Sequence, residues 1–179
     1  MAHIIRLKQC GSTNDEARKL YKCGGRDIVV IAGEQSNGRG RFERTFKSER
    51  GGAYFTVVTS KGGFSAETAT DAVQLAGRAV QAALAEFGVE TTLKWPNDVT
   101  VGGKKICGIL CETIFEVEQQ GGLPQFKAVM IGIGVNVHNP VCPELADIMT
   151  TLQKEAGAIY APALVIDNVL KHLFDKLDG

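Results

Sequence analysis

The sequence predicts an α+β fold, in which helices flank a mixed β-sheet. Apolar runs of strand length occupy 27–32, 51–60, 105–117 and 126–137. These runs follow one another across turn signals and do not alternate strictly with helices, so a doubly wound βαβ repeat is excluded. With 179 residues, the chain is long enough for one domain with a hydrophobic core and short for two. We therefore treat residues 1–179 as a single domain.

The N-terminal half is predicted to run strand, helix, strand, strand and helix. The first strand covers 3–8 and the first helix 13–22, where Thr13 and Glu16 have the spacing of a capping box. The apolar runs 27–32 and 51–60 supply the next two strands. From 66 to 87 a long amphipathic helix is expected, because apolar side chains recur at steps of three and four. These side chains are Val73, Ala76, Val80, Leu84 and Phe87.

The C-terminal half is predicted to begin with a strand over 89–95 and a turn at 96–98. A Gly-Gly pair at 102–103 then signals a hairpin, whose second strand is the apolar run 105–117. The turn-like stretch 119–124 leads into 126–137, which is nearly all apolar, as expected of a central strand. Helical patterns cover 143–157 and 162 to the end.

Composition excludes several classes of protein. The chain has 20 basic and 20 acidic residues, so no charge on the whole molecule favours nucleic acid or a membrane surface. No apolar stretch approaches the ~18 residues that span a bilayer, and the N-terminus does not resemble a secretory signal. Five cysteines without a C-x-x-C pair favour reduced thiols in a cytoplasmic protein over a disulfide framework or zinc site.

One loop is unusually basic. The stretch "GEQSNGRGRFERTF" covers 33–46, and from Arg39 to Arg50 five basic and two acidic side chains give a net charge of +3. Gly38 and Gly40 let the backbone approach a ligand, and arginine binds phosphate or carboxylate with paired donors. Ordering a residue costs roughly 1–2 kcal/mol, so we expect a loop that is mobile when empty and ordered on a polyanion. The alternative is a solvated surface loop without a ligand.

Two further motifs carry polar groups at strand ends. In "KWPND" and the strand after it, Asn97 and Asp98 are either turn formers or site residues, and Lys105 is either a solvated edge charge or an ammonium aimed into a site. The run "IGIGVN" places Gly132 and Gly134 within a strand, which favours close approach of a ligand or of another backbone. The third glycine of a dinucleotide-binding fingerprint is missing, so that interpretation is rejected.

Together these motifs resemble the catalytic domain of biotin protein ligase. The matching pieces are "STN" at 12–14, "GEQSNGRGR" with Arg44 and Phe46, "KWPND", "KKICGIL" and "GIGVN", in the family's order over about three quarters of the chain. The resemblance implies a fold related to class II aminoacyl-tRNA synthetases. It implies a reaction in two steps: biotin and MgATP give biotinyl-5′-AMP, and the biotinyl group then passes to a lysine. The implied ligands are biotin, ATP and Mg²⁺.

The resemblance also assigns roles to residues: Asp98 is placed to assist either magnesium or the incoming lysine, and the metal ligands are left unknown. Phe46 stands where the family usually has tryptophan, which predicts a smaller stacking area and weaker nucleotide binding. The implied catalytic residues are Lys105, Arg41, Arg39 and Asp98. The implied biotin contacts are Ser12, Thr13, Asn14, Gln35, Gly38, Arg39, Gly40, Arg41, Lys105 and Gly108. The implied ATP or AMP contacts are Arg41, Arg44, Phe46, Asn97, Lys105 and Asn136.

The partner implied by the resemblance is the biotin carboxyl carrier domain of a biotin-dependent carboxylase, and a homodimer is among the expectations. Since Ser12 lies near the start, we expect no N-terminal winged-helix domain and no DNA binding. We also expect that the family's small C-terminal β-barrel is absent. Two alternatives stay open: a lipoate or octanoate ligase of the same superfamily, and a non-catalytic module that binds biotin.

Overall fold

The computed structural model describes residues 2–68, 70–117 and 122–178, and a seven-stranded mixed sheet forms the centre of this part of the chain. The strand order is β1-β2-β3-β7-β6-β5-β4. Strands β1 and β2 pair in parallel, and the other neighbours are antiparallel. The strands are β1 (His3–Leu7), β2 (Ile28–Ala32), β3 (Ala53–Thr59), β4 (Thr92–Lys94), β5 (Asp98–Val101), β6 (Lys104–Glu116) and β7 (Gln125–Val135).

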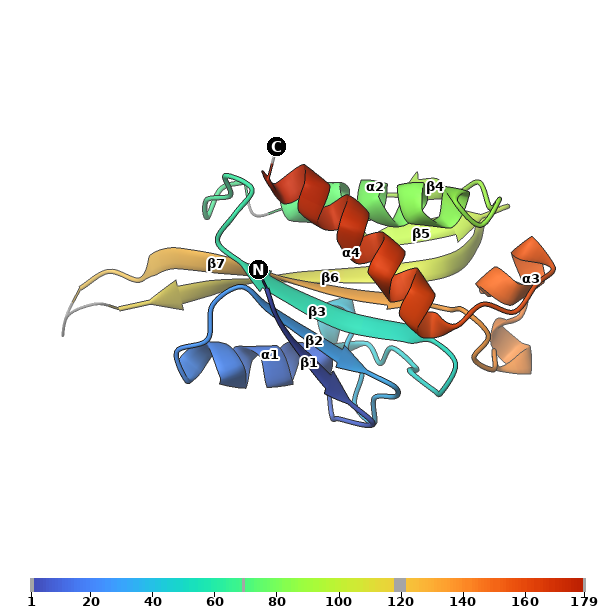
Figure 1. The fold of residues 1–179 in the computed structure, drawn as a ribbon, viewed down its shortest axis with the longest axis horizontal. Helices are drawn as coiled ribbons and strands as arrows, with labels where there is room; N and C mark the ends of the chain where they lie inside the picture. Colours follow the sequence, from blue (N-terminus) through green and yellow to red (C-terminus); the bar gives the residue numbers. More distant parts are fainter. Residues whose placement is uncertain (1, 69, 118–121, 179) are drawn as a thin grey trace.

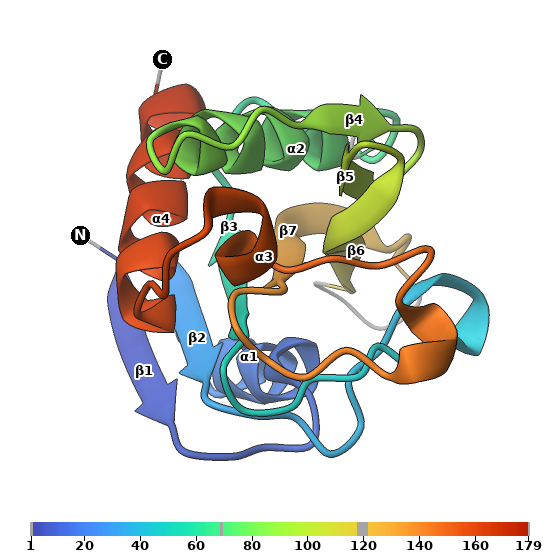
Figure 2. The ribbon, with the colours of Figure 1, turned by 90° about the vertical axis from the view of Figure 1, so that its right-hand side faces the viewer.

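Helices cover both faces of this sheet, which confirms the predicted α+β class. In Figure 1 the first helix lies beneath the sheet, and the second and fourth lie above it; Figure 2 shows β1 and β4 at opposite edges. The helices are α1 (Thr13–Lys22), α2 (Asp71–Ala85), α3 (Leu152–Ala156) and α4 (Pro162–Asp178), with short 3₁₀ turns η1 (Arg41–Glu43) and η2 (Pro143–Leu145).

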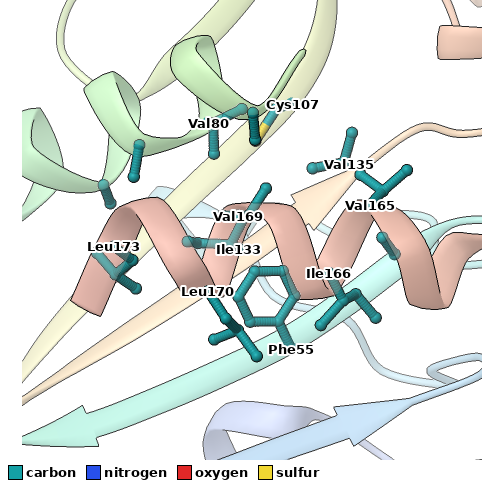
Figure 3. Close-up of a cluster of buried hydrophobic side chains, with 14 of the residues drawn as sticks. Phe55, Val80, Cys107, Ile133, Val135, Val165, Ile166, Val169, Leu170 and Leu173 are labelled. Carbon is teal, nitrogen blue, oxygen red and sulfur yellow. The ribbon is translucent and has the colours of Figure 1, made fainter. Parts of the chain in front are cut away.

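The alternation of residue types along β7 gives the two faces of the sheet different characters. Ile131 and Ile133 point to the α2 and α4 side, where they join the main hydrophobic core. Figure 3 shows Ile166 and Leu170 of α4 beside Phe55 of β3, and Val165 of α4 beside Val135 of β7, in this core. Fully burying one such side chain contributes about 1.5–3 kcal/mol, so this layer supplies much of the stability. The glycines of β7 fall on the α1 side and leave room there.

Two predicted helices differ from the structure. The helix predicted over 66–87 begins only at Asp71, after a series of turns. The helix predicted over 143–157 is wrong: between η2 and α3 the chain runs along β6. Lys105 N donates to Ile148 O at 2.8 Å and Thr150 N donates to Lys105 O at 2.9 Å. These backbone bonds hold the segment extended, because a helix would have to use the same groups internally.

The capping box predicted from Thr13 and Glu16 is also wrong, although the helix bounds 13–22 are confirmed. Ser12 occupies the N-cap position without a side-chain cap. The Thr13 side chain instead bonds to Gln35, and Glu16 pairs with Lys19. The turn predicted over 119–124 falls partly on 118–121, which lie outside the described residues.

Candidate ligand-binding site

A pocket, here called the polar pocket, opens on the α1 side of the sheet. It lies between the start of α1, the loop 33–50 and the facing strands β6 and β7. The structure thus brings together all five of the sequence motifs named above, which are spread along the chain. The predicted site residues that line the pocket are Ser12, Thr13, Asn14, Gln35, Arg39, Gly40, Phe46, Asn97, Lys105 and Gly108.

Glycines on paired strands make the pocket possible. Gly108 of β6 and Gly134 of β7 lie directly opposite each other in the sheet. A Cβ atom added at Gly134 would come within 2.5 Å of the Phe46 ring, and one at Gly108 within 3.0 Å. The Phe46 side chain therefore rests on a sheet surface that carries no side chains at these positions. Larger residues here would close the pocket.

The inner end of the pocket is a network of buried polar side chains. Thr13 donates to Gln35 Oε1 from its backbone N at 2.7 Å and from its Oγ1 at 3.1 Å. Thr56 of β3 donates to Asn14 Oδ1 at 2.6 Å, and Gln35 Nε2 donates to Ser48 Oγ at 2.8 Å. Because these side chains hold one another, their donors and acceptors have fixed directions. Because these side chains are neutral, this end of the pocket suits an uncharged polar group of a ligand.

An ion pair stands at the mouth of the pocket. Lys105 Nζ lies 2.7 Å from Asp98 Oδ1, and 5.5 Å from the centre of the Phe46 ring. Asp98 Oδ1 is shielded from solvent and has no hydrogen-bond partner among the described residues. Its contact with Lys105 is therefore an ion pair. An anion entering the pocket would compete with Asp98 for the ammonium group.

The loop 33–50 has more internal order than its composition predicts. Its two arms pair at Gln35 with Ser48 and at Arg39 with Thr45. Phe46 N donates to Gly38 O at 2.8 Å, so Gly38 serves the loop's own pairing and does not line the polar pocket. The loop is therefore a short irregular hairpin with its tip at η1.

The arginines at 39, 41 and 44 of this hairpin differ in their surroundings. Arg39 Nη2 lies 2.8 Å from Asp15 Oδ1 and 3.2 Å from Glu112 Oε2. Arg41 stacks on Phe42 at 4.8 Å, outside the polar pocket, and neither Arg41 nor Arg44 forms an ion pair with another described residue. In this arrangement Arg39 is neutralised by carboxylates, whereas the other two arginines are free to meet an anion. The predicted catalytic and biotin-binding roles of Arg39 stay predictions.

Asn136 does not reach the polar pocket. Its side chain is buried, donates to Thr150 O at 3.2 Å and accepts from Asn139 Nδ2 at 3.2 Å. These bonds hold the segment after β7 against the chain that crosses β6. The geometry gives Asn136 a structural position, and its predicted phosphate contact stays a prediction.

Two polar residues of the site were missed by sequence reasoning. Thr56 reaches the pocket wall from β3, and Glu112 of β6 contacts Asn14. A signal for Glu112 was present: it lies four residues after Gly108 in one strand, and so on the same face of the sheet. For Thr56 the sequence holds no comparable signal, because β3 reads as continuously buried.

Thiol chemistry is excluded at the pocket. Cys107 and Cys111 lie on the opposite face of β6, where burial raises the pKa of each thiol to about 12. Burial and the nearby Glu16 and Asp15 raise the pKa of Cys10 to about 11. All three thiols therefore stay protonated near neutral pH. Among the residues that the structure describes, no cluster of three or more metal-ligating side chains occurs, and no helix is long and apolar enough to cross a membrane.

Fold and site together define a class: an α+β domain whose glycine-bearing sheet, basic loop and strand-end lysine enclose a polar pocket. Comparison with known families then gives the family. The family model for the biotin/lipoate A/B protein ligase family matches residues 12–136, and the chain belongs to this family.

Individual relatives agree with this assignment. The chain is 32% identical over 173 residues to the bifunctional ligase/repressor BirA of Bacillus subtilis, covering 94% of this chain and 51% of that protein. It is 36% identical over 137 residues to the biotin–[acetyl-CoA-carboxylase] ligase of Paracoccus denitrificans, covering 73% of this chain and 53% of that protein. The chain thus spans about half the length of these curated relatives. A structure of biotin protein ligase from Aquifex aeolicus in complex with biotin and ATP superposes with a TM-score of 0.81 at 28% identity, covering 99% of this chain and 71% of that chain.

Proposed function

We propose that this chain is the catalytic core of a biotin protein ligase. It would join biotin to ATP, giving biotinyl-5′-AMP, and then transfer the biotinyl group to a lysine on a biotin carboxyl carrier domain. The observation that carries the proposal is the convergence of the Ser12–Asn14 segment, Gln35 and Lys105 on one pocket. The relative from Aquifex aeolicus, with biotin and ATP bound, supports the same function.

The polar wall favours biotin over lipoate. Biotin ends in a ureido ring with two N–H groups and one carbonyl, whereas the dithiolane ring of lipoate has no such groups. Gln35 and Thr13 line the pocket with polar groups that bond to each other, and that we propose share their bonds with the ureido ring. A site built to hydrogen-bond its substrate rejects an analogue without the matching groups, because its own buried polar groups then lose partners. We therefore assign the ureido ring to this wall and the carboxylate to the mouth.

In the first step, a carboxylate oxygen of biotin attacks the α-phosphorus of ATP. A new P–O bond forms, the bond from the α-phosphorus to the bridging oxygen breaks, and pyrophosphate leaves with the electron pair. Both reactants are anions, so their approach requires positive charge at the reacting atoms. We assign this charge to Lys105 and to Arg41 and Arg44 of the loop. The Lys105 ammonium group would leave Asp98 and bind the reacting oxygens instead. Magnesium enters as part of the MgATP substrate.

In the second step, the neutral amine of the acceptor lysine attacks the acyl carbon. The C–N bond forms, the bond from the acyl carbon to the phosphate oxygen breaks, and AMP leaves. The attacking nitrogen must lose a proton, and Asp98 is the carboxylate nearest to Lys105 at the pocket mouth. We assign Asp98 as the proton acceptor in this step.

Phe46 is assigned to the nucleotide. Its ring lies over the glycines at the pocket mouth and near Lys105, where the two substrates would meet. The weaker nucleotide binding expected from phenylalanine stays a prediction. We further propose a carboxylase carrier domain as acceptor, a cytoplasmic location and a homodimer. That the chain works as one catalytic domain without binding DNA also stays a prediction.

Release of pyrophosphate tests the proposal. Purified protein with MgATP is given biotin, lipoate or octanoate, and both pyrophosphate and the acyl adenylate are measured. We expect adenylate formation with biotin and none above background with the other two acids. Preference for lipoate or octanoate would instead identify the chain as a lipoate or octanoate ligase. Binding of biotin without any adenylate would make it a non-catalytic module.

A further inference from the structure

Glu112 of β6 joins three separate parts of the molecule at the polar pocket. Its Oε2 accepts from Asn14 Nδ2 at 2.6 Å and from Arg39 Nη2 at 3.2 Å. Its Oε1 accepts from Arg18 Nη2 at 3.2 Å. The chemistry proposed above gives this carboxylate no role. A side chain that is only 26% exposed and carries a charge needs such partners to be stable where it is.

We propose that Glu112 is a positioning residue: it fixes the orientation of the Asn14 amide and fastens Arg39, and with it the loop 33–50, over the polar pocket. The part of the inference that concerns biotin rests on the proposed function. The part that concerns the loop does not depend on any ligand.

The orientation of Asn14 follows from its two partners. A carboxylate can only accept, so Glu112 must face the NH₂ group of Asn14. On the other side, Thr56 Oγ1 lies 2.6 Å from Asn14 Oδ1 and can donate to it. Turning the amide over would set its carbonyl against the Glu112 carboxylate. The charge on Glu112 therefore fixes which atom of Asn14 faces the wall that holds the substrate ring.

The attachment of the loop follows from the ion pairs of Arg39. Arg39 forms the ion pairs that link the loop to the rest of the domain among the described residues. One goes to Asp15 of α1 and the other to Glu112 of β6. The pair of Arg50 with Glu34 stays within the loop. Loss of Glu112 would leave Asp15 as the one carboxylate holding Arg39.

This cluster of ion pairs also gives the arginines different roles. Arg18 and Arg39 face Glu112 and Asp15, so two positive and two negative groups balance one another. Such a cluster adds little attraction for a triphosphate. The attraction falls to Arg41 and Arg44, while Arg39 holds the hairpin from which they project. Of the arginines at 39, 41 and 44, the first thus anchors the loop and the other two are free for the ligand.

The test compares Glu112→Gln with Glu116→Gln, which removes a charge from the same strand near Tyr21, away from the polar pocket. In ligand-free protein, hydrogen exchange is followed at Gly40 and Phe46, whose amides close the hairpin. Biotin affinity is measured by calorimetry. We expect Glu112→Gln to speed exchange at both amides and to weaken biotin binding, each by about tenfold, as for lost bonds to a charged group. Glu116→Gln should change neither.

A second variant covers the case in which Glu112→Gln does not fold. Arg39→Met removes the same contact from its other side, at a loop side chain that is 37% exposed, and should speed exchange at Gly40 and Phe46 equally. Unchanged exchange in a folded Glu112→Gln protein, or in Arg39→Met if the former does not fold, overturns the proposal. If the wild-type chain binds no biotin while the variant still loosens the hairpin, the proposed function fails and the anchoring role stands.

Discussion

Lys105 and Asp98 form an ion pair across neighbouring strands at the mouth of the polar pocket, with 2.7 Å between Nζ and Oδ1. The pair holds the Lys105 ammonium group in position, and we expect a substrate oxygen to replace the Asp98 carboxylate there. Both residues belong to sequence motifs that were ambiguous in isolation. Because the two residues have different proposed roles, replacing Lys105 and replacing Asp98 should affect different steps of the reaction.

Lys105→Ala should keep the fold and lose adenylate formation. Loss of one group that stabilises the transition state typically lowers the rate by about 10²–10³-fold. The matched control is Lys104→Ala, because Lys104 Nζ donates to the backbone oxygen of Ala146 at the surface, away from the polar pocket. Adenylate formation is measured with labelled biotin, and folding by thermal melting. Near wild-type rates in Lys105→Ala would remove this lysine from the chemistry.

Asp98→Asn should separate the two half-reactions. The amide cannot take the proton of the acceptor amine, so transfer from isolated biotinyl-AMP should slow by about 10²-fold or more. Adenylate formation should persist, because the asparagine leaves Lys105 free for the substrates. The two steps are measured separately, by pyrophosphate release and by biotin incorporation into an acceptor domain. Equal losses in both steps would contradict a specific role in transfer.

Gly134→Ala should damage the pocket without touching any charged group. The new Cβ would lie 2.5 Å from the Phe46 ring, so the ring must move, and overpacking typically costs about 1–3 kcal/mol of stability. We expect weaker binding of ATP and biotin, measured by calorimetry. The control is Gly11→Ala, where the added Cβ meets no atom within 4 Å. Unchanged ligand binding in Gly134→Ala would show that Phe46 is not part of the site.

The loop should respond to substrates. Arg41 and Arg44, near the tip of the loop, form no ion pair with another described residue, so this part of the loop lacks charged partners until a ligand binds. Limited proteolysis should therefore cut within 37–50 in the empty protein and spare this segment with biotin and ATP bound. Cleavage products are identified by mass spectrometry. The same rate of cleavage in both states would argue that the loop does not close on the substrates.

Local sequence patterns predicted much of this molecule. The helix 13–22, the hairpin at 102–103 and the central strand near 126–137 agree with the structure. In "IGIG", a period of two places isoleucine in the core and glycine at the pocket. These features depend on neighbours in sequence, which is why a single chain reveals them.

The errors concern contacts between distant parts of the chain. The stretch 143–157 has a helical composition, but its backbone bonds to Lys105 hold its middle extended. The partners of Arg39, which are carboxylates of α1 and β6, could not be predicted either, while its role toward a ligand stays a prediction. Glu112 carried no motif of its own. Which charges meet depends on the assembled sheet, and no local pattern encodes that meeting.

A structure of the protein crystallised with biotin and a non-hydrolysable ATP analogue tests the central claim most directly. The account predicts the ureido ring against Thr13 and Gln35, the carboxylate within hydrogen-bond distance of Lys105, and the triphosphate beneath Arg41 and Arg44. Ligands bound elsewhere, or a loop turned away from both of them, would contradict it.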